Sequence, residues 1–132
     1  MYDSAGLQVL HREECLRLLS TVSIGRLVYT DRALPVVHPV VYALDGDAVV
    51  LRVPEGSATL AARDTIVAFE IDEVEPDLSK GWTVMVVGHL TEILDPEWLA
   101  RVRRLPLASR GHGKQDHYLA VRLEVVSGRR IP

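Results

Sequence analysis

The sequence predicts a mainly β protein, a small antiparallel barrel with a few short helices that forms a single domain over residues 1–132. Three observations predict this class. Six segments have the apolar pattern of strands, turns rich in Gly and Asp separate them, and helical patterns occur only as brief interruptions. Strands and helices do not alternate regularly along the chain, which favours a barrel over a parallel α/β sheet.

Turn residues or a short helix bound each of the expected strands. Asp45-Gly46 between two apolar runs is the strongest hairpin signal in the chain. Pro39 lies inside the second strand, where a proline fits only at an edge or a bulge because it cannot donate to the ladder. A bend is expected at Gly88 in the fifth strand. The strands are expected at residues 24–30, 34–44, 47–52, 65–72, 81–94 and 117–126.

Short helices are expected between these strands. Residues 12–20 have an amphipathic pattern that places Cys15 on the apolar face, so this thiol is expected in the core. A second helix is expected near residues 57–63. A third begins at Asp95-Pro96-Glu97, where an N-cap precedes a proline and an acidic first turn, and it ends before Pro106. Poor order or loop structure is expected at residues 1–10, 73–80 and 107–116.

Composition argues against several classes of function. The net charge is −3, whereas a nucleic-acid partner would require a strongly basic face. No apolar run approaches the length of a membrane helix, and the first residues lack a basic-then-apolar signal pattern. The single cysteine excludes an internal disulfide and agrees with a reducing compartment. We therefore expect a cytoplasmic protein with no membrane or nucleic-acid partner.

The stretch from Leu51 to Leu60 is the most informative segment for function. A strand ends at Arg52, Pro54-Glu55-Gly56 turns the chain, and Ser57 stands where the N-cap of a short helix belongs. Uncapped N–H groups beside an arginine and two hydroxyl groups suit a phosphate. The alternative is an ordinary strand–turn–helix junction with a solvated arginine. The local pattern leaves both interpretations open.

Neither metal binding nor self-contained catalysis is indicated by the sequence. The histidines lack the spacing of zinc ligands, and no Gly-x-Ser-x-Gly, P-loop or Gly-x-Gly-x-x-Gly motif occurs. His112 and His117 flank a glycine-rich loop and are expected to be solvated. No residue is assigned a catalytic role, so an enzyme of this sequence would rely on a cofactor for its chemistry. The histidines are His11, His38, His89, His112 and His117.

Several short motifs, taken in order, carry a family resemblance. They are Glu14-Cys15-Leu16-x-Leu18-Leu19, Gly25-Arg26-Leu27, Pro39-Val40-x-Tyr42, Arg52 with Gly56-Ser57, Val67-Ala68-Phe69-Glu70-x-Asp72, Gly81-Trp82-x-Val84-x-Val86-x-Gly88, and Ser127-Gly128-Arg129-Arg130-Ile131. From about residue 12 to the end, the chain resembles the pyridoxamine 5′-phosphate oxidase-like proteins, which are flavin-binding split barrels.

The resemblance implies a six-stranded Greek-key split barrel that forms a homodimer. It implies FMN, or in some branches a deazaflavin, in the groove between subunits, with Arg52 and Ser57 at the cofactor phosphate. Family members that hold FMN often have a threonine at the position of Val53 and a lysine at the position of Ala58. The cofactor-binding residues implied are Pro39, Val40, Arg52, Val53, Gly56, Ser57, Thr59, Trp82 and Val84.

The leading functional hypothesis is therefore a flavin- or deazaflavin-dependent oxidoreductase that acts on a small molecule. In such an enzyme the protein positions the ring and the cofactor transfers the hydride. One alternative is a dimeric module that binds or sequesters a flavin, haem or a related ligand without turnover. Another is an empty barrel that serves only as a dimeric interaction domain.

Overall fold

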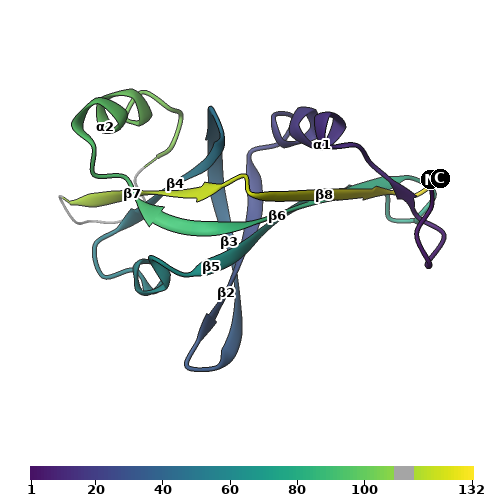
Figure 1. The fold of residues 1–132 in the computed structure, drawn as a ribbon, viewed down its shortest axis with the longest axis horizontal. Coiled ribbons are helices and arrows are strands. Elements are labelled where there is room, and N and C mark those ends of the chain that lie inside the picture. The colour runs from purple at the N-terminus through teal and green to yellow at the C-terminus, as the bar shows by residue number, and fades with distance from the viewer. Residues whose placement is uncertain (109–114) are drawn as a thin grey trace.

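Antiparallel strands close into a six-stranded barrel in the computed structural model, which describes residues 1–108 and 115–132 (Figure 1). The strands are hydrogen-bonded in the order β6-β5-β2-β3-β4-β7, and β7 pairs with β6 again to complete the barrel. This arrangement confirms the predicted mainly β barrel. Its strands are β2 (Ile24–Asp31), β3 (Leu34–Asp45), β4 (Ala48–Pro54), β5 (Ile66–Val74), β6 (Gly81–Glu92) and β7 (Asp116–Arg122).

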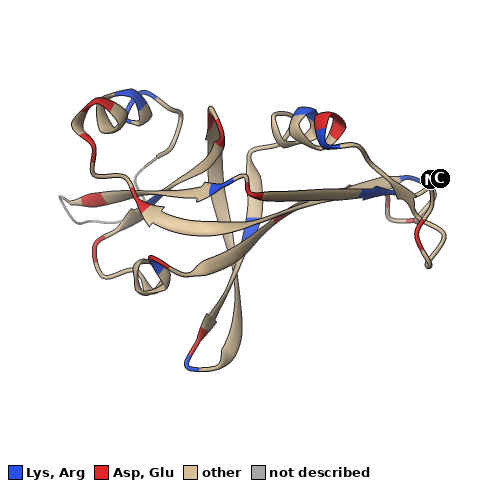
Figure 2. Cartoon of the chain, in the orientation of Figure 1, with Lys and Arg blue, Asp and Glu red and all other residues tan. Residues whose placement is uncertain are grey.

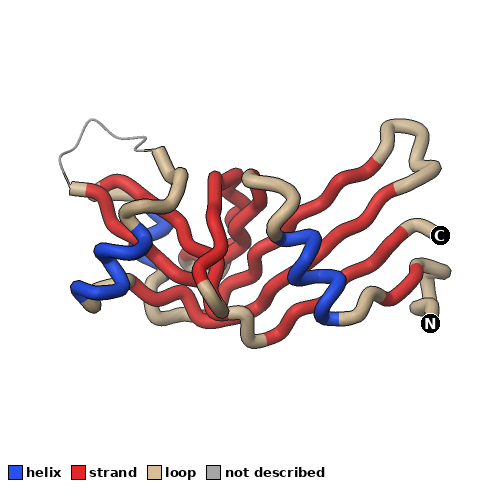
Figure 3. Tube along the Cα trace, turned by 90° about the horizontal axis from the view of Figure 1, so that it is seen from above, coloured by secondary structure: helices blue, strands red, loops and turns tan. Residues whose placement is uncertain are grey.

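A flat extension of the sheet leaves the barrel along β6. The first half of β6 pairs with β8 (Val125–Arg130), whereas the last residues of β6 pair with β7. Strand β1 (Gln8–Val9) pairs with the far edge of β8. This extension brings the two termini together at one end of the molecule, as Figure 1 and Figure 3 show.

Two sequence-based predictions are wrong in this region. The segment 117–126 was expected to be one strand, but it divides at Leu123 and Glu124 into β7 and β8. The alternation of apolar residues continues across this break, so the pattern does not reveal it. Residues 1–10 were expected to be poorly ordered, yet β1 lies within them and Leu10 is buried. A two-residue strand is too short to produce a periodic signal.

The barrel is split between β3 and β4. Within the described residues these strands pair only near their hairpin turn, from Tyr42↔Leu51 to Asp45↔Ala48. The first half of β3 pairs with β2 alone and forms an arm that projects from the barrel (Figure 1). The charged residues of the outer arm gather at its tip, the turn from Asp31 to Arg32 (Figure 2). Pro39 lies on this open edge, as predicted for a proline inside a strand.

Two apolar cores lie on opposite sides of the barrel wall. The main core fills the barrel and includes Cys15 from helix α1 (Arg12–Leu19), which confirms the predicted burial of this thiol. The second core lies beneath α2 (Pro96–Val102), where Trp98 and Val102 cover the outer face of β4 and β7. A short 3₁₀ helix, η1 (Ala58–Ala62), joins β4 to β5.

Of the helices in the described parts of the chain, none is long and apolar enough to cross a membrane. The predicted loop at residues 107–116 coincides in part with residues 109–114, which lie outside the described residues, as does His112.

Gly88 marks the point where β6 passes from its pairing with β8 to its pairing with β7. Val87 is still opposite Val125, whereas Leu90 is already opposite Val121. A Cβ atom added at Gly88 would lie 2.0 Å from the backbone carbonyl oxygen of Arg122. Only glycine therefore permits the close backbone approach that closes the barrel at this position.

We expect Gly88→Ala to lower the free energy of unfolding by about 3 kcal/mol, because backbone must move to accept the methyl group. Gly46→Ala is the matched control. A Cβ atom at Gly46 meets nothing within 4 Å, and its φ of +57° makes the substitution cost only about 1 kcal/mol. Urea unfolding of the two variants measures both values. An equal effect of the two substitutions would contradict a special role for Gly88.

Candidate functional site

A pocket of about 370 Å³ opens at the split between β3 and β4. It exists because the β3–β4 ladder stops at Tyr42 and Leu51, after which the two strands diverge. One wall comes from β3, and the opposite wall comes from the end of β4 and the entry to η1. Six residues of the predicted cofactor site line this pocket, namely Pro39, Val40, Arg52, Val53, Ser57 and Thr59.

The other three predicted site residues do not line the pocket. Gly56 lies in the turn just before η1, where its φ of +83° reverses the chain. Trp82 and Val84 lie on the first half of β6, where β8 is the partner strand, and Val84 is fully buried in the main core. The structure therefore brings together the residues from β3, β4 and η1 and separates them from those of β6.

Five pocket residues were not singled out from the sequence. They carry no local signal, because they become pocket residues only when the chain folds. His38 and Val41 belong to an ordinary strand pattern, and the ring of His38 contacts the edge of the buried Tyr29 ring. The five residues are Ile24, His38, Val41, Leu107 and Ala108.

Arg52 is held in place by groups of the chain itself. Its Nε donates to Asp116 Oδ2 at 2.7 Å, and its Nη1 donates to the carbonyl oxygen of Leu107 at 2.8 Å. Its guanidinium also lies over the ring of Tyr118. The interpretation as a solvated arginine is therefore wrong. Neither of these two bonds uses Nη2, and Arg52 is part of the pocket lining.

The turn before η1 differs from the predicted helix N-terminus. The element is a five-residue 3₁₀ helix, and Ser57 is its N-cap. Ser57 Oγ accepts from the N–H of Thr59 at 3.2 Å, and the carbonyl oxygen of Ser57 accepts from the N–H of Leu60. The N–H groups of Thr59 and Leu60, which were expected to be open to a phosphate, therefore bond to Ser57 instead. The hydroxyl of Ser57 accepts one bond here and can still donate its proton.

His117 connects the turn to the other side of the barrel. Its Nδ1 lies 2.6 Å from Glu92 Oε2, and its Nε2 is bonded to Glu55. Glu92 in turn accepts from Arg63 at 2.7 Å. The carboxylate of Glu55, and then that of Glu92, raises the pKa of His117 above its ordinary value.

The predicted solvation of His117 is therefore wrong, because its side chain is only 22% exposed and both ring nitrogens contact carboxylates. These partners are 62 and 25 residues away in the sequence, so no local pattern could have identified them. Arg63, just after η1, is paired with Glu92 at 2.7 Å.

The arrangement can bind a molecule that has an anionic end and a flat apolar part. Arg52 and Ser57 contribute hydrogen-bond donors to the pocket lining, and Pro39, Val41 and Leu107 contribute apolar surface. The positive charge of Arg52 is offset by Asp116, so the donors attract an anion at short range rather than through a strong field.

The comparisons with known proteins place the chain in a family. The family described as pyridoxamine 5′-phosphate oxidase matches residues 11–130. An uncharacterised protein of Mycobacterium tuberculosis is 37% identical over 128 residues, which cover 92% of this chain and 84% of that protein.

The solved structures that resemble the fold include two FAD-binding proteins. The FAD binding protein from Mycobacterium smegmatis has a TM-score of 0.85 and 28% identity, with 94% of this chain and 98% of that chain covered. A FAD-binding protein from Mesorhizobium loti has a TM-score of 0.73 and 21% identity, with 96% of this chain and 99% of that chain covered. It shares the fold. Since the family match extends over almost the whole chain, this protein belongs to the pyridoxamine 5′-phosphate oxidase-like family of split barrels.

Proposed function

We propose that this protein binds a flavin in the pocket between β3 and β4 and uses it as an oxidoreductase on a small molecule. The observation that carries the proposal is that Arg52 and Ser57 both line a pocket whose other residues are mostly apolar. The FAD binding protein from Mycobacterium smegmatis, which is similar over almost its whole length, supports a flavin as the ligand. When bound, a flavin supplies the hydride and electron transfer that the side chains of a protein cannot.

The pocket fits the chemistry of a flavin phosphate. Arg52 Nη2 and the hydroxyl of Ser57 are donors on neighbouring elements, and phosphate oxygens accept such bonds readily. Asp116 and the carbonyl oxygen of Leu107 fix the guanidinium before any ligand arrives, which reduces the entropy lost on binding. FMN and FAD both carry a phosphate next to the ribityl chain, so the same donors serve either one. We take FMN as the first flavin to test.

The apolar part of the pocket fits a flat ring but encloses only part of it. Pro39, Val41 and Leu107 exclude water from one side, and the volume of about 370 Å³ lies near the lower end for ligand pockets. Ile24 also lines the pocket, although its side chain is exposed on the outer face of the sheet. A second copy of the chain seated on this face would complete the pocket.

We expect Arg52→Ala to weaken FMN binding about tenfold to hundredfold, because a charge-assisted bond of about 1.5–3 kcal/mol is lost. Riboflavin lacks the phosphate and is expected to bind the two proteins alike. A general loss of structure would instead weaken both ligands. Quenching of flavin fluorescence measures each affinity, and equal FMN affinities in the wild type and the variant would contradict the proposed phosphate contact.

Ala58→Lys serves as the opposite control in the same titration. Ala58 is exposed at the first position of η1, so a lysine fits there without repacking. The new charge is expected to tighten the binding of FMN and to leave that of riboflavin unchanged.

Turnover separates an oxidoreductase from a protein that only binds the flavin. The titratable groups around the pocket are engaged with one another, as in the Arg52–Asp116 pair, and this observation favours the alternative of a sequestering module. For an oxidoreductase, we expect a nicotinamide donor to reduce the bound flavin and an acceptor to reoxidise it over many cycles. Stopped-flow absorbance records both steps. Failure of every donor tested to reduce the bound flavin faster than free flavin would favour the sequestering module.

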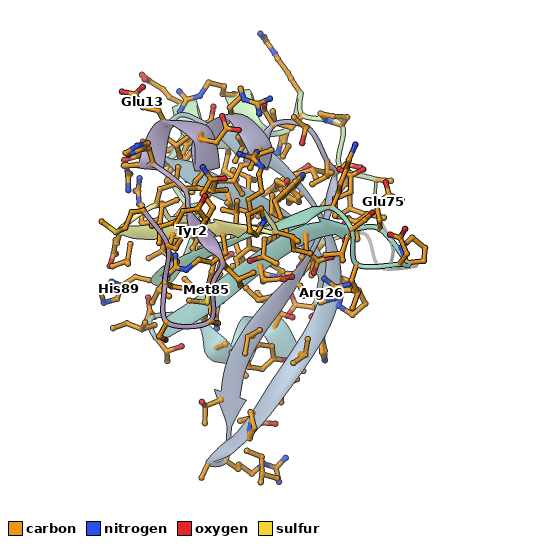
Figure 4. All side chains as sticks on the ribbon, turned by 90° about the vertical axis from the view of Figure 1, so that its right-hand side faces the viewer. Tyr2, Glu13, Arg26, Glu75, Met85 and His89 are labelled. Carbon is orange, nitrogen blue, oxygen red and sulfur yellow. The ribbon has the colours of Figure 1, made fainter. Side chains whose placement is uncertain are left out.

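We further propose that the protein is a homodimer that associates through the outer face of β2, β3, β5, β6 and β8. On this face a row of apolar side chains crosses five strands, because each member is the direct partner of the next in the ladder. Such a row buries well against a second copy of itself. Met85, labelled in Figure 4, lies on the same face and is 44% exposed. The row comprises Val37, Val28, Ala68, Val87 and Val125.

We expect the wild type to sediment as a dimer at micromolar concentration and Ala68→Asp to sediment as a monomer. The substitution places an unpaired carboxylate in the middle of the apolar row, which a dimer would have to bury. Ala100→Asp, on the exposed side of α2, is the matched control and is expected to remain a dimer. Analytical ultracentrifugation measures the oligomeric state of each protein. A dimeric Ala68→Asp variant would show that the chain associates through another face.

A further inference from the structure

A chain of four charged side chains bridges the two ends of η1. Glu55 precedes η1 and Arg63 follows it, while His117 and Glu92 come from strands β7 and β6. The links run from Glu55 to His117, from His117 Nδ1 to Glu92 at 2.6 Å, and from Glu92 to Arg63 at 2.7 Å. The segment that this chain closes contains Ser57, a donor of the pocket. The bridge therefore links the two ends of the segment that carries this donor.

The bridge requires the imidazole of His117 to carry two protons. A carboxylate only accepts hydrogen bonds, whereas a neutral imidazole has one N–H donor and one acceptor nitrogen. Both ring nitrogens of His117 face carboxylate oxygens, one from Glu55 and one from Glu92. Only the imidazolium can donate to both. The neutral ring would lose one of the two links and leave two carboxylates in mutual repulsion. The raised pKa of His117 agrees with this geometry.

The charges of the bridge sum to zero only when His117 is protonated. Glu55 and Glu92 are then matched by Arg63 and the imidazolium, whereas the neutral ring leaves one net negative charge beside the pocket. Three further charged groups among the described residues lie near the bridge. Asp116, next along β7, is paired with Arg52, and both line the same depression as His117 together with Arg103.

We propose that His117 is a positioning residue for the phosphate end of the pocket: its imidazolium holds Glu55 and η1 in place, and its deprotonation weakens the binding of a phosphate-bearing flavin. The inference rests on the proposed flavin function and names a group that controls it. The stabilising effect is complete below the ordinary pKa of the histidine. It is lost as the pH rises through the raised pKa of the folded protein. Affinity for the phosphate thus falls as the pH rises.

The measurement is FMN affinity between about pH 7 and 9.5, where the phosphate is already a dianion because its second pKa is about 6. Across this range the wild type is expected to lose about tenfold in affinity, the effect of one uncompensated charge close to the phosphate. His117→Gln is expected to bind FMN about tenfold more weakly than the wild type at pH 7 and to show no further fall. Riboflavin affinity is expected to stay within about twofold for both proteins, because the ligand carries no phosphate charge.

His89→Gln is the matched control. His89 also bonds a carboxylate, with its Nδ1 2.7 Å from Glu124 Oε1, but neither residue flanks η1 or lines the pocket. His89 lies at the outer edge of the molecule in Figure 4. This variant is expected to keep the pH profile of the wild type. A flat profile in the wild type, or the same slope in His117→Gln, would overturn the proposal.

Proton NMR of the folded wild type gives a second test that needs no stable variant. The imidazole signal that is missing from the His117→Gln spectrum, or is assigned through backbone connectivity, is followed against pH with and without FMN. Binding is expected to raise the pKa of His117, because linkage is reciprocal. An unchanged pKa in the presence of bound FMN would overturn the inference alone. Absence of FMN binding in every titration would overturn the proposed function, and the inference with it.

Discussion

Hydrogen bonding between β3 and β4 stops at Tyr42 and Leu51, and the pocket depends on that break. Beyond it, Pro39 offers no N–H toward the missing partner, and Arg52 pairs with β7 through Tyr118. Beyond the break the two strands diverge and leave a gap between β3 and β4. The turn that leads into η1 covers one side of this gap. The opening that is left is lined by side chains from both strands.

Pairing among charged residues governs the electrostatics of this opening. Arg52 is matched by Asp116, and His117 is matched by Glu55 and Glu92. A pocket lined by matched pairs attracts anions weakly from a distance but presents fixed donors at contact. Affinity for a phosphate then depends on a few well-held atoms. The protonation of one ring can therefore matter as much as a substitution.

The barrel could be predicted because its strands are long enough to show alternation and its turns carry Asp and Gly. Local pattern also predicted that Arg52 ends a strand and that Ser57 caps the next helical turn, since both belong to a single strand–turn–helix segment. It failed where the decisive partner is distant in sequence. Asp116 and His117 acquire their roles only through the pairing of β4 with β7. The end of β7 was missed for a related reason, because alternation of period two passes through the break unchanged.

Ligand binding and self-association are physically connected in the proposed assembly. Ile24 and Pro39 line the pocket and are also exposed on the outer face of the barrel, where the apolar row lies. A second copy on that face would contact the ring of a bound flavin, and a bound flavin would add surface to the contact. Because coupling between two equilibria is reciprocal, flavin would strengthen the dimer by the factor with which the dimer strengthens flavin binding. In the proposed assembly, the open edge between β3 and β4 would be the place where cofactor and subunit meet.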